Sequence, residues 1–416
     1  MKNSIRVMHF ADTHFGVELH GRLDPETGLN TRLKDFKKSL MSAMDLALDA
    51  GIQLAVFAGD AYKTRDPRAT DQREFAACIR RLTDQSIPVV LLTGNHDMPA
   101  VSGKAHAVEI YHTLGVTHVT VLNKAEIVVV PTAMGPVRIA ALPYINRGYS
   151  FSKELVHGKT VEEARALVEQ KYCDDARRLA EEVRRADDQV PTILLGHFWA
   201  RGAKLSDWQR GYFQLNEPQV PLEALTDPAF DYVALGHVHR HQDLNPSRTP
   251  HVVYSGSPDR IDFGEKDETK GFVILDLWKG GANYRFVPIA EGRPFIDIEV
   301  DVDASCEDPT ARIVQEIKKW PLRNAVVKLT YKILDGKQQF VRDRDIREAL
   351  APAFLVASIS RSVQRDPIAR SKMLTESLRP REALELYIDT RPNLKTRKEL
   401  LLRYADPLIT ELIDAG

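Results

Sequence analysis

The chain has 416 residues, of which 43 % are hydrophobic, and its 57 lysines and arginines balance 58 aspartates and glutamates to a formal net charge of −1. This length allows two or three domains with a sizeable core, and the hydrophobic content is ordinary for a globular protein. The charge balance neither requires nor excludes a nucleic-acid partner, whose surface would have to be a local basic patch.

Cysteine usage and the lack of long apolar segments indicate the compartment. Cys78, Cys173 and Cys306 are widely separated, odd in number and without metal-ligand spacing, so we expect no disulfide framework. The chain begins without an apolar signal-type segment, and no stretch reaches the uninterrupted length of a membrane span. We therefore expect a cytoplasmic protein with no membrane partner.

The N-terminal part of the chain alternates strand and helix patterns. Apolar strand patterns cover residues 5–10, 53–57 and 88–92. Residues 31–50 carry apolar side chains at three- and four-residue intervals, which predicts an amphipathic helix, and a second such helix precedes the third strand. This order predicts a parallel α/β sheet with right-handed crossovers.

The next part of the chain predicts a second sheet packed on the first. Residues 160–188 form a long, highly charged helix pattern. The short strand patterns lie at residues 119–122, 127–130, 137–142, 192–195, 232–235, 252–257 and 271–277. Together with the first sheet they predict a two-sheet α/β sandwich that ends near residue 292.

Beyond residue 292 the elements become shorter. Residues 293–362 alternate strand and helix patterns, which predicts a small α+β domain appended to the sandwich of residues 1–292. Residues 363–379 are polar and locally basic, which is typical of a linker. Two amphipathic segments within residues 380–416 predict a helical tail.

The apolar residues of this tail are too many for a solvated segment and too few for an independent domain. Amphipathic helices commonly lay an apolar face into a groove. We therefore expect the tail to dock, either on the chain itself or on a partner helix. The residues expected to make this contact are Leu384, Ile388, Leu401 and Leu408.

Five strand patterns end in side chains that bind metal ions. The strand-end candidates are Asp12, His14, Asp60, Asn95, His197, His237 and His239. Open α/β sheets bind ligands at the carboxyl ends of parallel strands, where these residues would meet. A single histidine at a strand end is more often a surface or hydrogen-bonded residue, but five strands with the same ending are not plausibly a coincidence.

This ligand set suits a pair of divalent ions. Imidazole and carboxylate ligands bind manganese, iron or zinc. Seven ligands are too many for one ion but suit two ions if one carboxylate bridges them. Two ions about 3.5–4 Å apart clamp the oxygens of a phosphoryl displacement and make hydroxide from water near neutral pH. Phosphoester hydrolysis is the expected reaction, and His96 is the candidate to stabilise the transition state or protonate the leaving oxygen.

The motifs resemble those of the calcineurin-like metallophosphoesterase superfamily. The matching segments are Asp12-x-His14, Gly59-Asp60, Gly94-Asn95-His96-Asp97, Gly196-His197 and Gly236-His237-x-His239. Within the superfamily, three further features are similar to double-strand-break repair nucleases of the bacterial SbcCD type. They are the run from Gly59 to Pro67, the Tyr254-Ser255-Gly256-Ser257 turn, and the small domain with its helical tail.

The resemblance implies a DNA nuclease with two divalent ions, taken to be Mn²⁺. The implied roles are one ion on Asp12, His14 and His239, the other on Asn95, His197 and His237, a bridging Asp60, and a His96 that aids the transition state. It further implies exonuclease and endonuclease action on DNA ends and hairpins in repair and recombination. The implied partners are a second copy of the chain, whose small domain caps the DNA groove, and an SbcC-like ABC ATPase bound to the tail in a heterotetramer.

One position departs from the superfamily pattern. Many relatives carry a histidine or aspartate three residues after the bridging aspartate, where it supports the catalytic histidine, and here that position is Lys63. A lysine side chain cannot accept the proton of His96, so we expect it to meet a phosphate or to point into solvent. His20 and Arg22, on the long polar loop after His14, are further candidates for substrate contact.

Three other functions compete with the nuclease. A small-molecule or cyclic-nucleotide phosphodiesterase would use the same ions but would need neither the extra domain nor the tail. A protein phosphatase is disfavoured because such enzymes usually carry Asp-Arg-Gly after the bridging aspartate, where this chain has Lys63-Thr64-Arg65. A non-catalytic scaffold subunit would typically have lost several ligands, and here none is missing.

Overall fold

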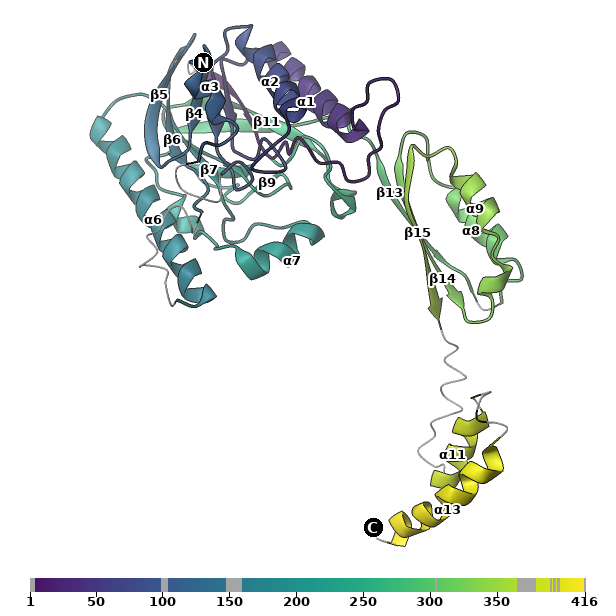
Figure 1. Ribbon diagram of the computed structural model, residues 1–416. Helices are drawn as coiled ribbons and strands as arrows, with labels where there is room; N and C mark the ends of the chain where they lie inside the picture. The colour runs from purple at the N-terminus through teal and green to yellow at the C-terminus, as the bar shows by residue number, and fades with distance from the viewer. Residues whose placement is uncertain are drawn as a thin grey trace. The chain divides into compact units, whose positions relative to one another are not determined.

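The computed structural model describes residues 4–98, 104–146, 159–303, 305–364, 379–389, 391, 394 and 397–414. The chain forms two compact units (Figure 1). The first consists of Met1–Ile296 with Asn324–Val326, and the second of Asp297–Arg323 with Val327–Gly416. In the described part of the chain, no helix is long and apolar enough to cross a membrane.

The first sheet has the strand order β12-β11-β1-β2-β3-β4. Its strands are β1 (Ile5–Phe10), β2 (Leu54–Phe57), β3 (Val89–Leu92), β4 (Val119–Leu122), β11 (Gly271–Trp278) and β12 (Gly281–Pro288). The strands from β1 to β4 are parallel. β11 runs antiparallel to β1, with Ile5 opposite Leu277.

The prediction that residues 271–277 belong to the second sheet is wrong, because β11 pairs with β1 and extends the first sheet. The same correction applies to residues 119–122, which form β4 beside β3. A strand with apolar residues on both faces fits either sheet, so its pattern alone does not choose its neighbour. β12 pairs with β11 at the edge of the first sheet and was not predicted.

The second sheet has the strand order β5-β6-β7-β8-β10-β9. Its strands are β5 (Glu126–Thr132), β6 (Gly135–Leu142), β7 (Thr192–His197), β8 (Tyr232–Gly236), β9 (Gln242–Asp243) and β10 (His251–Tyr254). β6, β7, β8 and β10 are parallel, while β5 and β9 run antiparallel at the two edges. Each sheet therefore gathers the carboxyl ends of several parallel strands at one edge, where open α/β sheets bind ligands.

Helices cover the outer face of each sheet, with α1 and α2 on the first and α6 on the second (Figure 1). The helices of this unit are α1 (Thr31–Asp49), α2 (Ala69–Thr83), α3 (Glu109–Thr113), α6 (Val161–Ala186) and α7 (Asp207–Asn216). Asn30 caps α1 by accepting a hydrogen bond from the backbone N–H of Arg32. Thr160 and Glu163 form a capping box at the start of α6, which fixes where this charged helix begins.

Three apolar cores hold the layers together. Met8 and Phe10 of β1 face the core beneath α1 and α2, whereas Ile5 and Val7 face the core between the two sheets. This alternation is the two-residue period of a strand that is buried on both faces. The third core lies between the second sheet and α6. The order helix, sheet, sheet, helix confirms the predicted two-sheet α/β sandwich.

The C-terminal part of the chain contains a three-stranded sheet, two helices and a helical tail. The strand order is β13-β14-β15. The elements are β13 (Phe295–Asp301), α8 (Pro309–Ile317), β14 (Val326–Leu334), α9 (Asp343–Leu350), β15 (Leu355–Gln364), α11 (Pro380–Asp389) and α13 (Lys398–Asp414). β15 extends into the first two residues of the predicted linker, and residues 365–378, most of that linker, lie outside the described residues.

The two tail helices, α11 and α13, contact each other. Ile388 of α11 is only 1 % exposed and Leu402 of α13 only 8 % exposed, so both belong to the interior of this helical pair. Leu384 and Leu401 are half-buried. Leu408 is 61 % exposed and is therefore the predicted contact residue most accessible to another molecule.

Candidate metal centre

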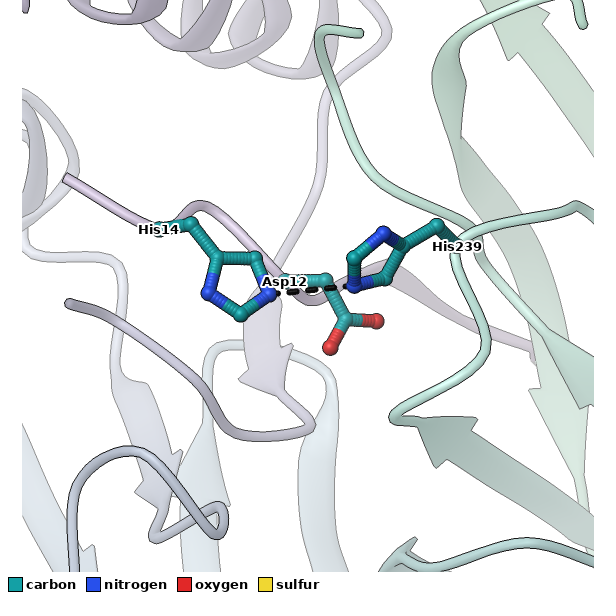
Figure 2. Close-up of side chains that lie close together, drawn as sticks. All are labelled: Asp12, His14 and His239. Atoms are coloured by element: carbon teal, nitrogen blue, oxygen red, sulfur yellow. Dashed lines mark hydrogen bonds between the residues drawn. The ribbon is translucent and has the colours of Figure 1, made fainter. Parts of the chain in front are cut away.

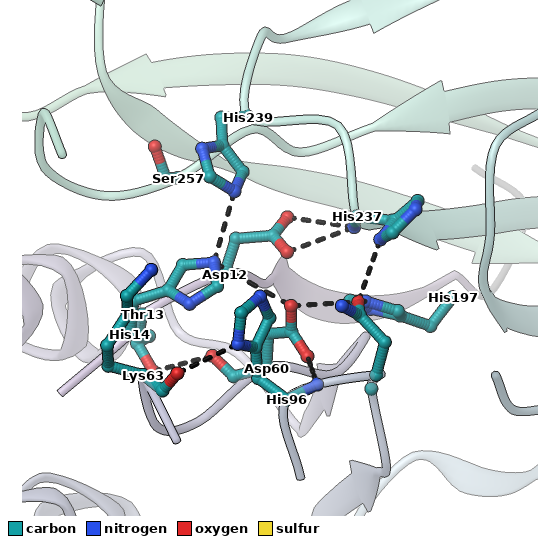
Figure 3. A network of polar contacts seen from close by, with 12 residues as sticks. Asp12, Thr13, His14, Asp60, Lys63, His96, His197, His237, His239 and Ser257 are labelled. Carbon is teal, nitrogen blue, oxygen red and sulfur yellow. Dashed lines mark hydrogen bonds and ion pairs between the residues drawn. The ribbon is translucent and has the colours of Figure 1, made fainter. Parts of the chain in front are cut away.

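The carboxyl ends of five strands bring the predicted ligands together. Along the chain, β1 is followed by Asp12 and His14, β2 by Asp60, and β3 by Asn95 and His96, while β7 ends in His197 and β8 is followed by His237 and His239. The first three strands belong to one sheet and the last two to the other. The site therefore lies where the strand ends of the two sheets meet (Figure 3).

Glycines before the ligands allow the backbones to approach closely at this point. A Cβ atom at Gly236 would lie 2.1 Å from the carbonyl oxygen of Ala58. A Cβ atom at Gly94 would lie 2.5 Å from the backbone nitrogen of Asp60. No side chain fits at such distances, so the Gly-His and Gly-Asn-His motifs are also packing requirements.

Four of the candidate ligands have a left-handed backbone. Their φ angles are 55° at Asp12, 44° at His14, 63° at Asp60 and 88° at His237. Such conformations cost about 1–3 kcal/mol each outside glycine, and they cluster at functional sites. Backbone hydrogen bonds hold two of them: Asp12 donates to the Gly59 carbonyl at 3.0 Å, and His14 donates to the Asp60 carbonyl at 3.1 Å.

The first group of ligands, which we call the Asp12 group, consists of Asp12, His14 and His239 (Figure 2). Their ligand atoms lie within 4.8 Å of one another, and all three side chains are buried. The Nε2 atoms of His14 and His239 are 3.0 Å apart. Both carboxylate oxygens of Asp12 lie 3.0 Å from the backbone nitrogen of His237, which orients the carboxylate.

The second group, which we call the Asn95 group, consists of Asn95, His197 and His237. The Oδ1 atom of Asn95 is 3.1 Å from His197 Nε2 and 2.9 Å from His237 Nδ1. Asp60 lies between the two groups, because its Oδ2 atom is 3.7 Å from His14 Nε2 and 3.4 Å from His197 Nε2 (Figure 3). A carboxylate in this position is suited to bridge two ions.

Acceptor atoms surround the His197 imidazole. His197 Nδ1 donates to the Ala58 carbonyl at 2.6 Å, and its Nε2 atom faces the oxygens of Asn95 and Asp60. Burial opposes a charged His197, but Asp60 and then Asp12 outweigh it and raise the pKa of this imidazole to about 9. The protein thus favours positive charge here, and the residues fit a divalent cation.

His96 lies beside the ligands without belonging to either group. Its backbone N–H donates to Asp60 Oδ1 at 2.9 Å, and its Nδ1 lies 2.8 Å from the main-chain carbonyl oxygen of Lys63 (Figure 3). Burial lowers the pKa of the His96 imidazole. A cavity of about 200 Å³ is lined by His96, Lys63 and several candidate ligands. Lys63 therefore supports His96 through its backbone, a contact that its side-chain type does not reveal.

Asp97 ties the loops after β2 and β3 together. Its carboxylate accepts hydrogen bonds from the backbone N–H groups of Asp60 at 2.8 Å, Ala61 at 3.0 Å and Gly94 at 2.9 Å. The side chain is 1 % exposed, and burial together with the charge of Asp60 raises its pKa to about 7. The sequence contains Asp97 within the matching motif, but this role follows only from the folded loops.

Residues outside the motifs complete the surroundings of His237 and His239. Gln209 of α7 donates to the carbonyl oxygen of His237 at 2.8 Å, and the ring of Phe213 stacks on the His237 imidazole at 4.3 Å. Glu265 lies 2.7 Å from His239 Nδ1. Sequence reasoning missed all three, because α7 was not predicted and isolated Gln, Phe and Glu residues carry no distinctive spacing.

The three predicted substrate-contact residues, Lys63, His20 and Arg22, differ in whether they line the cavity. Lys63 lines the cavity. The ring of His20 packs edge-on against Phe263 at 5.0 Å and Phe295 at 5.7 Å, and Arg22 is exposed on the same loop. Among the described residues, the cavity lining includes neither His20 nor Arg22.

A helix-covered double sheet with a buried Asp and His cluster at its strand ends defines the class of metal-dependent phosphoesterases. The chain belongs to the calcineurin-like phosphoesterase family, whose pattern it matches over residues 5–241. The predicted superfamily is thereby confirmed, and the chain is a hydrolase with a divalent-metal site.

Relatives within the family include named nucleases. The chain is 28 % identical to the SbcD component of the SbcCD nuclease of Bacillus subtilis over 304 residues, which are 70 % of this chain and 71 % of the relative. It is 25 % identical to the SbcD component of Staphylococcus epidermidis over 321 residues, 75 % of each chain. It is 24 % identical to the DNA double-strand break repair protein Mre11 of Thermoplasma acidophilum over 323 residues, 76 % of this chain and 74 % of the relative. The resemblance to double-strand-break repair nucleases is confirmed.

Proposed function

We propose that this protein is a DNA nuclease that hydrolyses phosphodiester bonds with two divalent ions, Mn²⁺ in the first instance, and acts on DNA ends and hairpins in repair and recombination. The observation that carries the proposal is the pair of ligand groups on either side of Asp60, next to a cavity that His96 and Lys63 line. The names of the relatives, nuclease SbcCD and the DNA double-strand break repair protein Mre11, supply the substrate class.

In this proposal the Asp12 group holds one ion, the Asn95 group holds the other, and Asp60 serves both. Bound divalent ions lower the pKa of water and stabilise the oxygens of an in-line phosphoryl displacement. The chain's own residues orient the substrate and move protons. His96 keeps its Nδ1 proton on the Lys63 carbonyl, which leaves Nε2 for the substrate.

His96 is neutral before substrate binds, because its burial disfavours the charged ring. A phosphodiester brings negative charge to the cavity, which favours protonation at Nε2. The Lys63 carbonyl accepts the Nδ1 proton in both states of the ring, so the imidazole does not have to turn. In our proposal His96 then protonates the leaving oxygen, and the Lys63 ammonium contacts a phosphate of the substrate.

The proposal includes two partners besides DNA. We infer a homodimer within a heterotetramer, in which an SbcC-like ABC ATPase binds the helical tail in the cytoplasm. The relatives are named as one subunit of a nuclease, which supports a second type of subunit. Leu408, which is 61 % exposed, is the most accessible of the predicted contact residues, whereas Ile388 is buried within the tail.

The test is a cleavage assay of the purified chain on labelled single-stranded and duplex DNA with Mn²⁺, Mg²⁺ or chelator. Asp60→Asn is the control for contaminating nucleases. Mn²⁺-dependent cutting that the variant lacks supports the nuclease. Hydrolysis of bis-p-nitrophenyl phosphate without any cutting of DNA, alone or with its ATPase, favours the small-molecule phosphodiesterase. Inactivity toward both substrates favours the non-catalytic scaffold.

A further inference from the structure

The imidazole of His239 is held by a buried carboxylate from outside the metal-binding motifs. His239 Nδ1 lies 2.7 Å from Glu265 Oε1, and the two side chains are 4 % and 1 % exposed. An ionised carboxylate can accept hydrogen bonds but cannot donate them. Glu265 therefore keeps the imidazole proton on Nδ1 and leaves the lone pair on Nε2. That nitrogen is the atom that faces His14 within the Asp12 group (Figure 2).

Glu265 is itself held in place by two donors on its other oxygen. Oε2 accepts a hydrogen bond from the backbone N–H of Ile261 at 3.0 Å and forms an ion pair with Lys270 Nζ at 2.8 Å. Lys270 is 3 % exposed, and its ammonium also contacts the carbonyl oxygen of His239 at 3.1 Å. The buried Glu265–Lys270 ion pair thus contacts both the imidazole and the main-chain carbonyl of His239, which restricts the ring to one orientation.

The other histidine ligands have weaker outer contacts. His197 Nδ1 donates to a neutral backbone carbonyl, that of Ala58. The carboxylate of Glu217 lies 3.9 Å from His237 Nε2, beyond hydrogen-bond length. Within the described residues, His14 Nδ1 has no hydrogen-bond partner. Among these four rings, the described contacts therefore place a carboxylate at hydrogen-bond distance from the outer ring nitrogen, the one turned away from the other candidate ligands, only at His239.

We propose that Glu265, braced by Lys270, is a positioning residue that makes the Asp12 group the tighter of the two metal sites. A carboxylate behind a histidine ligand orients the ring and raises its basicity, and loss of such a partner typically weakens metal binding about 10–100-fold. The Asn95 group has an amide and a carbonyl-oriented imidazole instead, so it lacks this contribution. This inference rests on the metal centre of the proposed function.

The experiment is calorimetric titration of Mn²⁺ into the metal-stripped full chain. We expect two unequal binding steps in the wild type and a loss of about 10–100-fold in the tighter step for Glu265→Gln. Glu268→Gln is the matched control, because Glu268 also contacts Lys270, at 2.8 Å, whereas the carboxylate against His239 Nδ1 is that of Glu265. We expect this control to stay within about threefold of the wild type.

Two background variants assign the effect to one group. In an Asn95→Ala background, Glu265→Gln should still weaken the remaining site. In an Asp12→Ala background, it should change Mn²⁺ affinity little. Equal weakening in both backgrounds, or none in either, overturns the proposal. A wild-type chain that binds no Mn²⁺ overturns the metal centre as well, and the two failures are thus distinguishable.

A purely structural role for Glu265 is tested by a second variant. Glu265→Gln leaves the buried ammonium of Lys270 with one anionic partner fewer, so its unfolding by urea is measured with chelator present. The double variant Glu265→Gln, Lys270→Met removes the unpaired charge. A double variant that recovers stability but still binds Mn²⁺ weakly supports positioning, whereas recovery of both properties together contradicts it.

Discussion

The imidazole Nδ1 of His96 lies 2.8 Å from the main-chain carbonyl oxygen of Lys63. Residue 63, three positions after Asp60, therefore supports the histidine without a side-chain acceptor. Any residue type that keeps the loop conformation can supply this carbonyl, which leaves the lysine side chain available for another task. The sequence-based expectation concerned the lysine side chain, which cannot accept the proton of His96, and the main-chain carbonyl of the same residue lies in that position instead.

We predict that His96→Ala lowers nuclease activity about 10²–10⁴-fold, the usual contribution of a positioned acid or base. Mn²⁺ binding should remain, because His96 belongs to neither ligand group. The measurement is the Mn²⁺-dependent cleavage rate beside a calorimetric titration of the same preparation. His112→Ala, at an exposed histidine of α3, is the matched control. Unchanged cleavage by His96→Ala would remove this residue from the mechanism.

Lys63→Ala separates the two roles of residue 63. Its backbone carbonyl stays, so the orientation of His96 and kcat should change little. Loss of the ammonium should raise KM about 3–10-fold, because a contact made equally in ground and transition states is removed. Steady-state kinetics on an oligonucleotide substrate at fixed ionic strength make this comparison. A large fall in kcat with constant KM would instead place the side chain in the chemical step.

The sequence predicts the side chains of this site that follow strand patterns, but not the backbone atoms or the residues that tertiary packing brings to it. Asp12, Asp60 and the four candidate histidines can be found in the sequence because they follow apolar runs, and strand ends converge in a parallel sheet. The contact of the Lys63 carbonyl with His96 cannot be predicted from the sequence, because every residue has a main-chain carbonyl. Glu265 and Gln209 reach the site from a short 3₁₀ turn and from α7, and their distance from His239 and His237 is set by tertiary packing alone.

The fold, too, has features that the sequence predicts and features that it does not. Met8 and Phe10 alternate with Ile5 and Val7, so the two buried faces of β1 are predictable from its residues. The neighbour of β11 is not, because that strand is apolar on both faces and its pairing with β1 closes a contact between residues far apart in the chain. Pattern determines the type of element, and long-range packing determines its partner.

Asp97→Asn should destabilise the protein by about 2–3 kcal/mol. The carboxylate accepts three backbone hydrogen bonds, and an amide places an N–H group against at least one of these donors, which leaves it unsatisfied in a buried place. Urea unfolding with chelator present measures the loss apart from metal binding. Asp66→Asn, on the exposed loop after Lys63, serves as control. Equal stability of both variants would contradict the role assigned to Asp97.

We predict that the buried His9 makes the folding stability of the two-sheet sandwich fall at acidic pH. It lies between the sheets, 3.3 Å from the Tyr232 hydroxyl and 3.2 Å from the Leu235 carbonyl, and burial lowers its pKa to about 3. In the unfolded chain, His9 has the ordinary histidine pKa of about 6.5. Below that pH the unfolded chain binds a proton that the folded chain does not, so the stability falls as the pH falls. This one group accounts for about 2 kcal/mol of lost stability between pH 7 and pH 5.

The measurement compares urea unfolding of the wild type and His9→Gln at both pH values with chelator present. The variant has its own stability, so the quantity of interest is the difference between pH 7 and pH 5. That difference should be about 2 kcal/mol smaller in His9→Gln, since glutamine does not titrate. Equal pH dependence of the two proteins would mean that His9 is protonated in the folded state.

Deletion of residues 380–416 tests the tail. We expect the truncated chain to lose binding to its ATPase partner and to keep basal cleavage of single strands, because the described tail residues contribute nothing to the cavity lining. A point variant refines the test: Leu408→Asp places a charge at a 61 % exposed apolar position and should weaken the partner complex at least about tenfold, since burying one leucine contributes about 1.5–3 kcal/mol. Arg403→Ala, at an exposed polar position of α13, is the control. Co-purification of the truncated chain with the ATPase would show that the contact lies elsewhere.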